Sequence, residues 1–120
     1  MPDFRTNKAW QHAHHLALEV YKYTAKGFPR DEQFGLVSQM RRAAVSIPAN
    51  IAEGSGRAGT KEYLQFLYIA KGSLNELEYY VLLSVELGFV SIGTSGMLDN
   101  IRQEVGRTLN GLIASLKRKV

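Results

Sequence analysis

The sequence predicts an all-α protein, an antiparallel up-down four-helix bundle that residues 1–120 form as one domain. Three observations support this fold class. Four segments carry apolar residues at helical spacing, each segment ends in glycine, proline or polar turn residues, and no segment alternates as a strand does. Short connections between long helices favour antiparallel neighbours, so we expect each helix to run opposite to the next.

The first helix is expected at about residues 7–26. Its apolar face comprises Trp10, Ala13, Ala17, Val20, Tyr21 and Thr24. Gly27 can end this helix in a left-handed conformation, and Pro29 prevents the helix from continuing.

The second helix is expected at about residues 31–54, with Asp31 as its N-cap. Pro48 lies inside the apolar stripe of this segment and removes one backbone donor. Because the stripe continues to Ile51 at the same period, Pro48 predicts a kink rather than the end of the helix.

The third and fourth helices are expected at about residues 60–87 and 95–119. Thr60 is a suitable N-cap for the third helix, and Glu62 in its first turn suits the helix dipole. Gly88 followed by Phe89 repeats the stop chemistry of Gly27 and Phe28.

The third helix is apolar on more than one face, although a helix of a four-helix bundle buries about one stripe. One interpretation is a wide core stripe with scattered surface aromatics. The other, which we favour, is a homo-oligomer, because tyrosine is enriched in subunit interfaces. The candidate interface residues are Leu64, Tyr68, Ile69, Tyr79, Tyr80, Leu82 and Leu83.

A polar stripe follows one side of the second helix. Its members lie within one arc of about 80° at about 100° per residue; they are Gln39, Arg42, Ser46, Asn50 and Glu53. The stripe is either a hydrogen-bonded seam that holds the helix in place, which we favour, or a site for a ligand or partner.

The formal net charge of +4 and the sequence pI of about 9.5 are compatible with an anionic partner such as RNA or DNA. Arginine and lysine can neutralise phosphates without reading bases. The alternatives are a solvated basic face and cations that favour a helix C-terminus. The candidate nucleic-acid-binding residues are Arg41, Arg42, Arg57, Arg102, Arg107, Lys117, Arg118 and Lys119.

No arrangement typical of an enzyme stands out. The chain has no cysteine, and His12, His14 and His15 point three ways on a helix, so they do not converge on one metal ion. No Glu-x-x-His motif or nucleophile elbow occurs. We therefore expect no enzyme activity, cofactor, metal or small-molecule substrate. The polar N-terminus and the lack of a long apolar run predict a cytoplasmic protein without a membrane span.

Residues 36–54 have the sequence LVSQMRRAAVSIPANIAEG, which is highly specific. This run resembles the four-helix-bundle proteins encoded in intervening sequences of bacterial 23S rRNA genes. Further matches cover nearly the whole chain and include Trp10, Val20, Tyr21, Phe28, Pro29, Phe66, Leu67, Ala70, Ser73, Leu74, Glu76, Leu77 and Glu78.

The resemblance implies an up-down bundle that assembles as a pentamer, and it implies no catalytic residues. A related accessory protein of diversity-generating retroelements assists a reverse transcriptase and binds nucleic acid through a basic surface. Residues 104–107 and the basic C-terminus look similar to that relative. Our leading hypothesis is a non-enzymatic oligomeric module that binds RNA or nucleoprotein. The alternative is a protein-interaction scaffold with no nucleic-acid role.

Overall fold

The computed structural model describes residues 3–120, and every regular element in that range is a helix. The four long helices are α1 (Lys8–Thr24), α2 (Leu36–Ser55), α3 (Thr60–Glu86) and α4 (Ile92–Lys117). Two short 3-10 helices, η1 (Phe4–Thr6) and η2 (Arg30–Glu32), precede α1 and α2. The predicted all-α four-helix class is confirmed.

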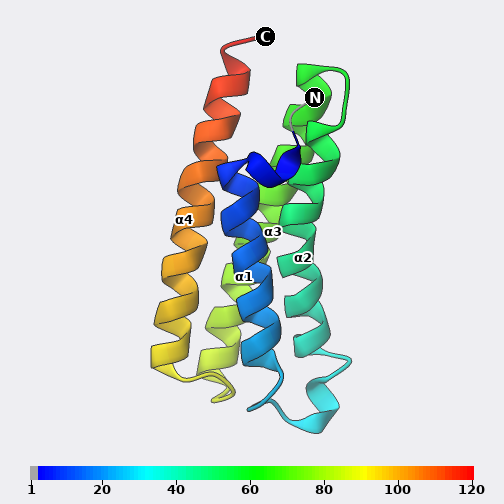
Figure 1. Ribbon diagram of the computed structural model, residues 1–120. Helices are drawn as coiled ribbons and strands as arrows, with labels where there is room; N and C mark the ends of the chain where they lie inside the picture. The colour runs from blue at the N-terminus through cyan, green and yellow to red at the C-terminus, as the bar shows by residue number, and fades with distance from the viewer. Residues whose placement is uncertain (1–2) are drawn as a thin grey trace.

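The four helices lie side by side, and the colour gradient in Figure 1 shows successive helices running in opposite directions. Contacts join α1 to α2, α2 to α3, α3 to α4 and α4 back to α1. Over residues 3–120, no Cα atom of α1 approaches α3 within 8 Å, so these two helices are diagonal neighbours. The molecule is elongated, with principal extents of 46 × 24 × 20 Å.

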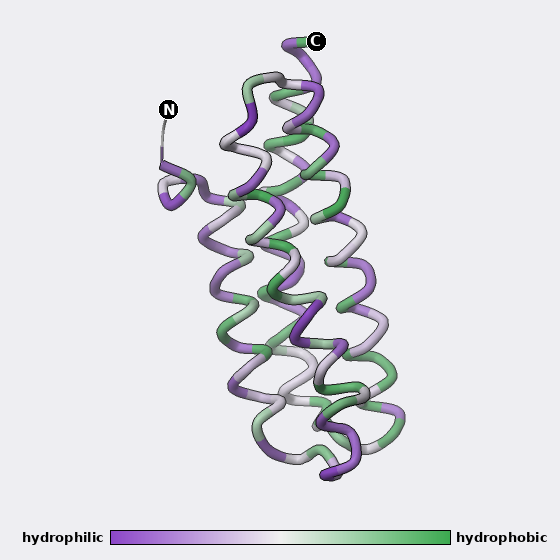
Figure 2. Tube along the Cα trace, turned by 90° about the vertical axis from the view of Figure 1, so that its right-hand side faces the viewer, coloured by the Kyte–Doolittle hydropathy of each residue, from purple (hydrophilic) through white to green (hydrophobic). Residues whose placement is uncertain are grey.

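The core runs along the axis between the four helices. Figure 2 shows hydrophobic and hydrophilic stretches alternating along each helix, as expected when one face packs inward. Each helix contributes fully buried side chains: Leu16 and Val20 from α1, Met40, Ile47 and Ile51 from α2, Leu67 and Leu77 from α3, and Val105 and Leu109 from α4. The apolar periodicity of the sequence therefore corresponds to the buried faces, with one correction in α1: Tyr21, expected on the core face, is 45 % exposed, and Leu16, which was not selected, is buried.

The second helix begins at Leu36, five residues later than expected from Asp31. Residues 30–32 form η2 instead, and Gly35, with φ −108° and ψ −110°, has a backbone conformation outside the helical region that interrupts the helical path. A carboxylate oxygen of Glu32 accepts a hydrogen bond from the Leu36 amide at 3.0 Å. The side chain that caps α2 is therefore Glu32, and the expected N-cap role of Asp31 is wrong.

The other helix ends also differ from the expected ones. Asn7 caps α1 by accepting from the Trp10 amide at 3.2 Å. Gly59 occupies the N-cap of α3 and makes no side-chain cap, so Thr60 is the first helical residue. Ser91 caps α4 by accepting from the Thr94 amide at 3.1 Å, which starts α4 three residues earlier than Ser95.

Two glycines end α1 and α3 as the sequence indicates. Gly27 has φ +90° and Gly88 has φ +81°, values that side-chain-bearing residues rarely adopt. Phe28 and Phe89 then meet with ring centroids 5.5 Å apart and close this end of the bundle. Within α2, the helix runs through Pro48 without ending there, and the kink at that position stays a prediction.

Candidate nucleic-acid interface

The candidate arginines and lysines do not gather on one face. They follow α2, the α2–α3 turn and most of α4, and half of them are engaged by groups of the chain itself. The partners of each cation therefore decide which positions remain available to a phosphate.

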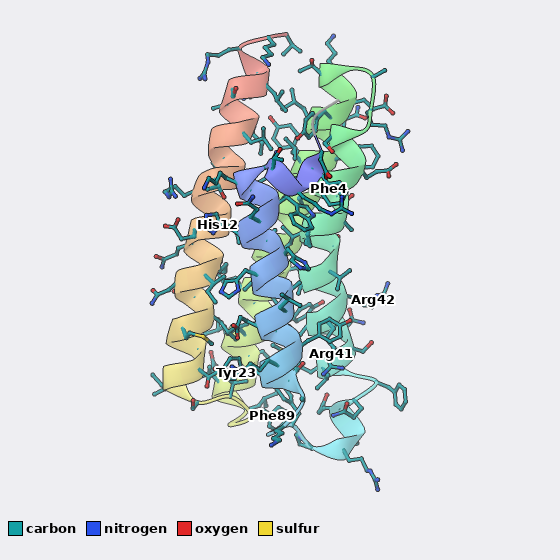
Figure 3. All side chains as sticks on the ribbon, in the orientation of Figure 1. Phe4, His12, Tyr23, Arg41, Arg42 and Phe89 are labelled. Carbon is teal, nitrogen blue, oxygen red and sulfur yellow. The ribbon has the colours of Figure 1, made fainter. Side chains whose placement is uncertain are left out.

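Arg41 links α2 to α1. Its Nε donates to the Thr24 hydroxyl at 2.9 Å, its Nη2 donates to the Tyr21 carbonyl at 3.3 Å, and its Cζ lies 4.5 Å from the centroid of the Tyr21 ring. Thr24, almost fully buried, in turn donates to the Val20 carbonyl at 2.7 Å. Arg41 is therefore a half-buried structural cation with part of its guanidinium turned outward (Figure 3).

Three other candidates form ion pairs. Arg57 pairs with Glu53 and with Glu62, the latter at 3.3 Å, while its guanidinium lies 4.8 Å from the centroid of the Phe66 ring. These contacts join the end of α2 to the start of α3. Arg57 is thus neutralised by two carboxylates where the chain turns.

Arg102 and Arg107 are paired along α4. Arg102, whose side chain is only 19 % exposed, bridges Asp99 at 2.6 Å and Glu78 of α3 at 3.0 Å. Arg107 pairs with Glu104 at 2.7 Å, and this contact holds the pKa of the Glu104 carboxyl below its usual range. Neither arginine presents an uncompensated charge.

The remaining candidates are exposed and have no ion-pair partner among residues 3–120: Arg42, Lys117, Arg118 and Lys119. Three of these cations are consecutive: Lys117 is the last residue of α4, and Arg118 and Lys119 follow it. Figure 1 shows the C-terminus and the α2–α3 turn at the same end of the bundle. Lys61, which was not among the predicted candidates, is an exposed cation at the start of α3 on that end.

The polar stripe of α2 divides into three parts. Ser46 accepts hydrogen bonds from Asn50 Nδ2 at 3.0 Å and from the Ser73 hydroxyl of α3 at 2.8 Å, which connects the two helices. Glu53 belongs to the Arg57 ion pairs. The side chains of Gln39 and Arg42 make no hydrogen bond or ion pair within the described residues, and both residues are exposed. The hydrogen-bonded seam therefore comprises Ser46 and Asn50 with Ser73, while Gln39 and Arg42 lie outside it.

Gly54 explains why α2 and α3 can approach closely beside this seam. A Cβ at this position would lie 2.8 Å from Tyr63 Cδ1 and 2.9 Å from Phe66 Cβ. Burial raises the pKa of the Tyr63 phenol, to which Asn7 Nδ2 donates at 3.4 Å. The α2–α3 junction is therefore tightly packed, and its residues have a structural role.

The candidate interface residues of α3 occupy different environments. Leu64 is 7 % exposed and belongs to the core of its own chain, so its side chain does not lie on the exposed surface that an interface needs. Tyr80 and Leu83 are half-buried against that core. The exposed members are Tyr68, Ile69, Tyr79 and Leu82, with exposed fractions of 46, 52, 56 and 54 %.

A cleft of about 420 Å³ lies between α3 and α4, with Leu16 and Val20 of α1 among its lining residues. Tyr79 and Leu82 belong to its α3 wall, and Leu98 belongs to its α4 wall. A second groove, of about 500 Å³, lies along α2 and includes Tyr21 of α1. Figure 3 places Arg41 and Arg42, which line this second groove, on the same half of α2.

Over residues 3–120, no three histidine, aspartate or glutamate side chains gather as a metal site. His14 stacks on Trp10 with ring centroids 4.8 Å apart, whereas His12 lies on the α4 side of α1 near Glu104. Within the same range, no helix is both long enough and apolar enough to cross a membrane.

Residues 5–111 match the family model described as 23S rRNA-intervening sequence protein. The chain belongs to this family. The match covers all of α1, α2 and α3 and most of α4, so it extends over all four helices of the bundle. Neither the family description nor the structural match below names a catalytic activity.

The fold of this 23S rRNA-intervening sequence protein is similar to a crystal structure from Bacteroides thetaiotaomicron. That structure is described as a protein with unknown function from the S23 ribosomal protein family. The TM-score is 0.80 at 21 % sequence identity, and the similarity covers 88 % of this chain and 97 % of the other. No curated protein matches the chain.

Proposed function

We propose that this intervening-sequence protein is a non-enzymatic, oligomeric bundle that binds RNA or a nucleoprotein through phosphate contacts at its C-terminal end. The observation that carries this proposal is the run Lys117, Arg118 and Lys119. All three side chains are exposed at the end of α4 and have no carboxylate partner in the part of the chain that the structure describes.

The residues around this run also favour phosphate binding at this end of the molecule. Lys61 is exposed at the start of α3, on the end where α4 finishes (Figure 1). Glu53 and Glu62 on that end are already engaged by Arg57, which reduces their repulsion of an approaching phosphate. A surface of this kind binds nucleic acid by charge and carries no base-specific readout.

The proposal predicts strong salt dependence. Three phosphate contacts give a log–log slope of affinity against salt of about −2 for single strands and about −3 for duplexes. The test is fluorescence anisotropy with labelled fragments of 23S rRNA, titrated with salt. No affinity at low salt would contradict the proposal.

A matched pair of variants locates the site. The triple change Lys117→Gln, Arg118→Gln and Lys119→Gln removes the run, and we expect an affinity loss of at least about tenfold with a shallower salt slope. The control changes Lys22, Lys26 and Lys71 to glutamine, because these exposed lysines lie on α1, the chain after it and the middle of α3. Equal losses in both triple variants would reject the C-terminal site.

The oligomeric part of the proposal rests on the exposed apolar side chains Tyr68, Ile69, Tyr79 and Leu82 of α3. Exposed apolar groups concentrated on one helix mark an interaction surface. Light scattering at micromolar concentration tests this part, and a species of 13.4 kDa would contradict it. A partner protein that remains bound after nuclease treatment and at high salt would favour the scaffold hypothesis instead.

A further inference from the structure

Phe34 is the most exposed large apolar residue among those that the structure describes, with an exposed fraction of 98 %. It lies in the turn between η2 and α2 and forms one wall of the 500 Å³ groove, here called the aromatic groove. Arg41 and Arg42 line the same groove, and no aspartate or glutamate lines it. An exposed aromatic ring beside two cations is typical of an interface anchor.

The cleft between α3 and α4, here called the acidic cleft, has the opposite character. Leu77, Val81 and Leu98 line it together with the α1 residues described above. Glu78 and Asp99 also line it, and the single Arg102 compensates only one of these two negative charges. The acidic cleft is therefore an apolar pocket that carries a net negative charge.

The two surfaces are complementary in polarity and charge. One presents a projecting phenyl ring and cations, and the other presents an apolar recess and carboxylates. The charge pattern of the helices agrees with this match: α2 carries no carboxylate before Glu53, whereas Glu78 of α3 and Asp99 of α4 both line the cleft. Opposite charges on facing patches favour one docking register over others.

A single chain cannot bring these surfaces together, because α2 and α4 lie on opposite sides of the bundle (Figure 1). We infer that Phe34 of one copy enters the acidic cleft of a second copy, with Arg42 facing Glu78. This inference rests on the proposed oligomerisation and assigns the two faces that meet. The contact is head-to-tail, so each copy uses one groove and one cleft, and successive copies form a closed ring or an open filament.

The inference first predicts a crosslink between two different positions. The chain has no cysteine, so thiols can be placed at will. Gln33→Cys labels the rim of the aromatic groove and Asn75→Cys labels the rim of the acidic cleft, and both residues are exposed and leave Phe34, Arg42 and Glu78 intact. A short bis-maleimide should join the two variants when they are mixed and should join neither variant to itself.

The matched control replaces Asn75→Cys with Asn110→Cys, an exposed position on α4 away from the cleft. No crosslink is expected from the mixture of this variant with Gln33→Cys. Efficient crosslinking of Gln33→Cys or Asn75→Cys with itself would overturn the head-to-tail arrangement, because it would show a two-fold contact.

The second prediction concerns affinity. Phe34→Ala should weaken association about 10- to 100-fold per contact, while circular dichroism and thermal unfolding of the monomer stay unchanged because Phe34 touches little of its own chain. Arg42→Glu should also weaken association, and adding Glu78→Lys should restore much of it. Weakening by Arg42→Glu without rescue would count against the pairing of Arg42 with Glu78.

The outcomes separate this inference from the proposed function. A monomer at all concentrations rejects both the oligomer and these faces. An oligomer whose mass and affinity ignore Phe34→Ala, with no crosslink, rejects the faces and leaves oligomerisation standing. If Phe34→Ala lowers RNA affinity in the salt titration and leaves the mass unchanged, the aromatic groove is a nucleic-acid site and the inference is wrong.

Discussion

Replacing Gly54 with alanine tests the account of the α2–α3 junction most directly. The added methyl group would lie 2.8 Å from Tyr63 Cδ1 and 2.9 Å from Phe66 Cβ. Phe66 Cβ is attached directly to the backbone, so relief requires movement of α3. Overpacking of this kind costs about 1–3 kcal/mol. The helix propensity of alanine recovers at most about 1 kcal/mol, and less in the last turn of α2. We expect a net loss of about 1–2 kcal/mol.

The measurement is urea unfolding followed by circular dichroism at one fixed protein concentration, so that assembly contributes equally to each variant. Gly111→Ala is the matched control, because Gly111 is an exposed position within α4 where an added Cβ meets nothing within 4 Å. That variant should gain about 0.5–1 kcal/mol. If Gly54→Ala is as stable as the parent while the control behaves as expected, the close-approach argument is refuted.

Three further predictions concern single contacts. Ser73→Ala removes the donor to Ser46 and should lower the free energy of unfolding by about 1 kcal/mol, measured by urea unfolding. Gly88→Ala should cost about 1–2 kcal/mol in the same assay, because φ is +81° there. The pKa of Glu104, followed by NMR titration, should lie below its usual range and rise in Arg107→Gln. Because this pKa is lowered by folding, the pair stabilises the protein above the unfolded-state pKa, and that contribution is lost as the pH falls through the folded-state pKa.

The long helices were predictable because apolar periodicity reports directly which face is buried. Their first residues were less predictable, because capping depends on backbone geometry that residue type alone does not determine. The α2 start is the clearest case: Asp31 is a good N-cap by composition, yet Glu32 caps from four residues before Leu36 because Gly35 changes the chain direction. Ser91 caps α4 from the ordinary N-cap position, several residues before the apolar stripe begins.

The candidate site was harder to predict, because a sequence counts cations without showing their partners. Arg102 meets Glu78, which lies on another helix, and Arg41 meets Thr24 across the α1–α2 contact. Leu64 lies three residues before Leu67 on the single stripe that α3 buries, so its side chain packs into the core of its own chain. Phe34 was not selected from the sequence, since only the structure shows that its turn leaves the ring uncovered.

The ring of contacts among the four helices has a consequence for synthesis of the chain. Because α1 packs directly against α2 and α4 and lies diagonally opposite α3, one side of the first helix has no neighbouring helix until the last helix exists. The α2–α3 hairpin contains only neighbours in sequence and can assemble while the ribosome is still translating. The four-helix bundle cannot close until residues 92–117 have been synthesised. A chain that terminates before them leaves Leu16 and Val20 exposed.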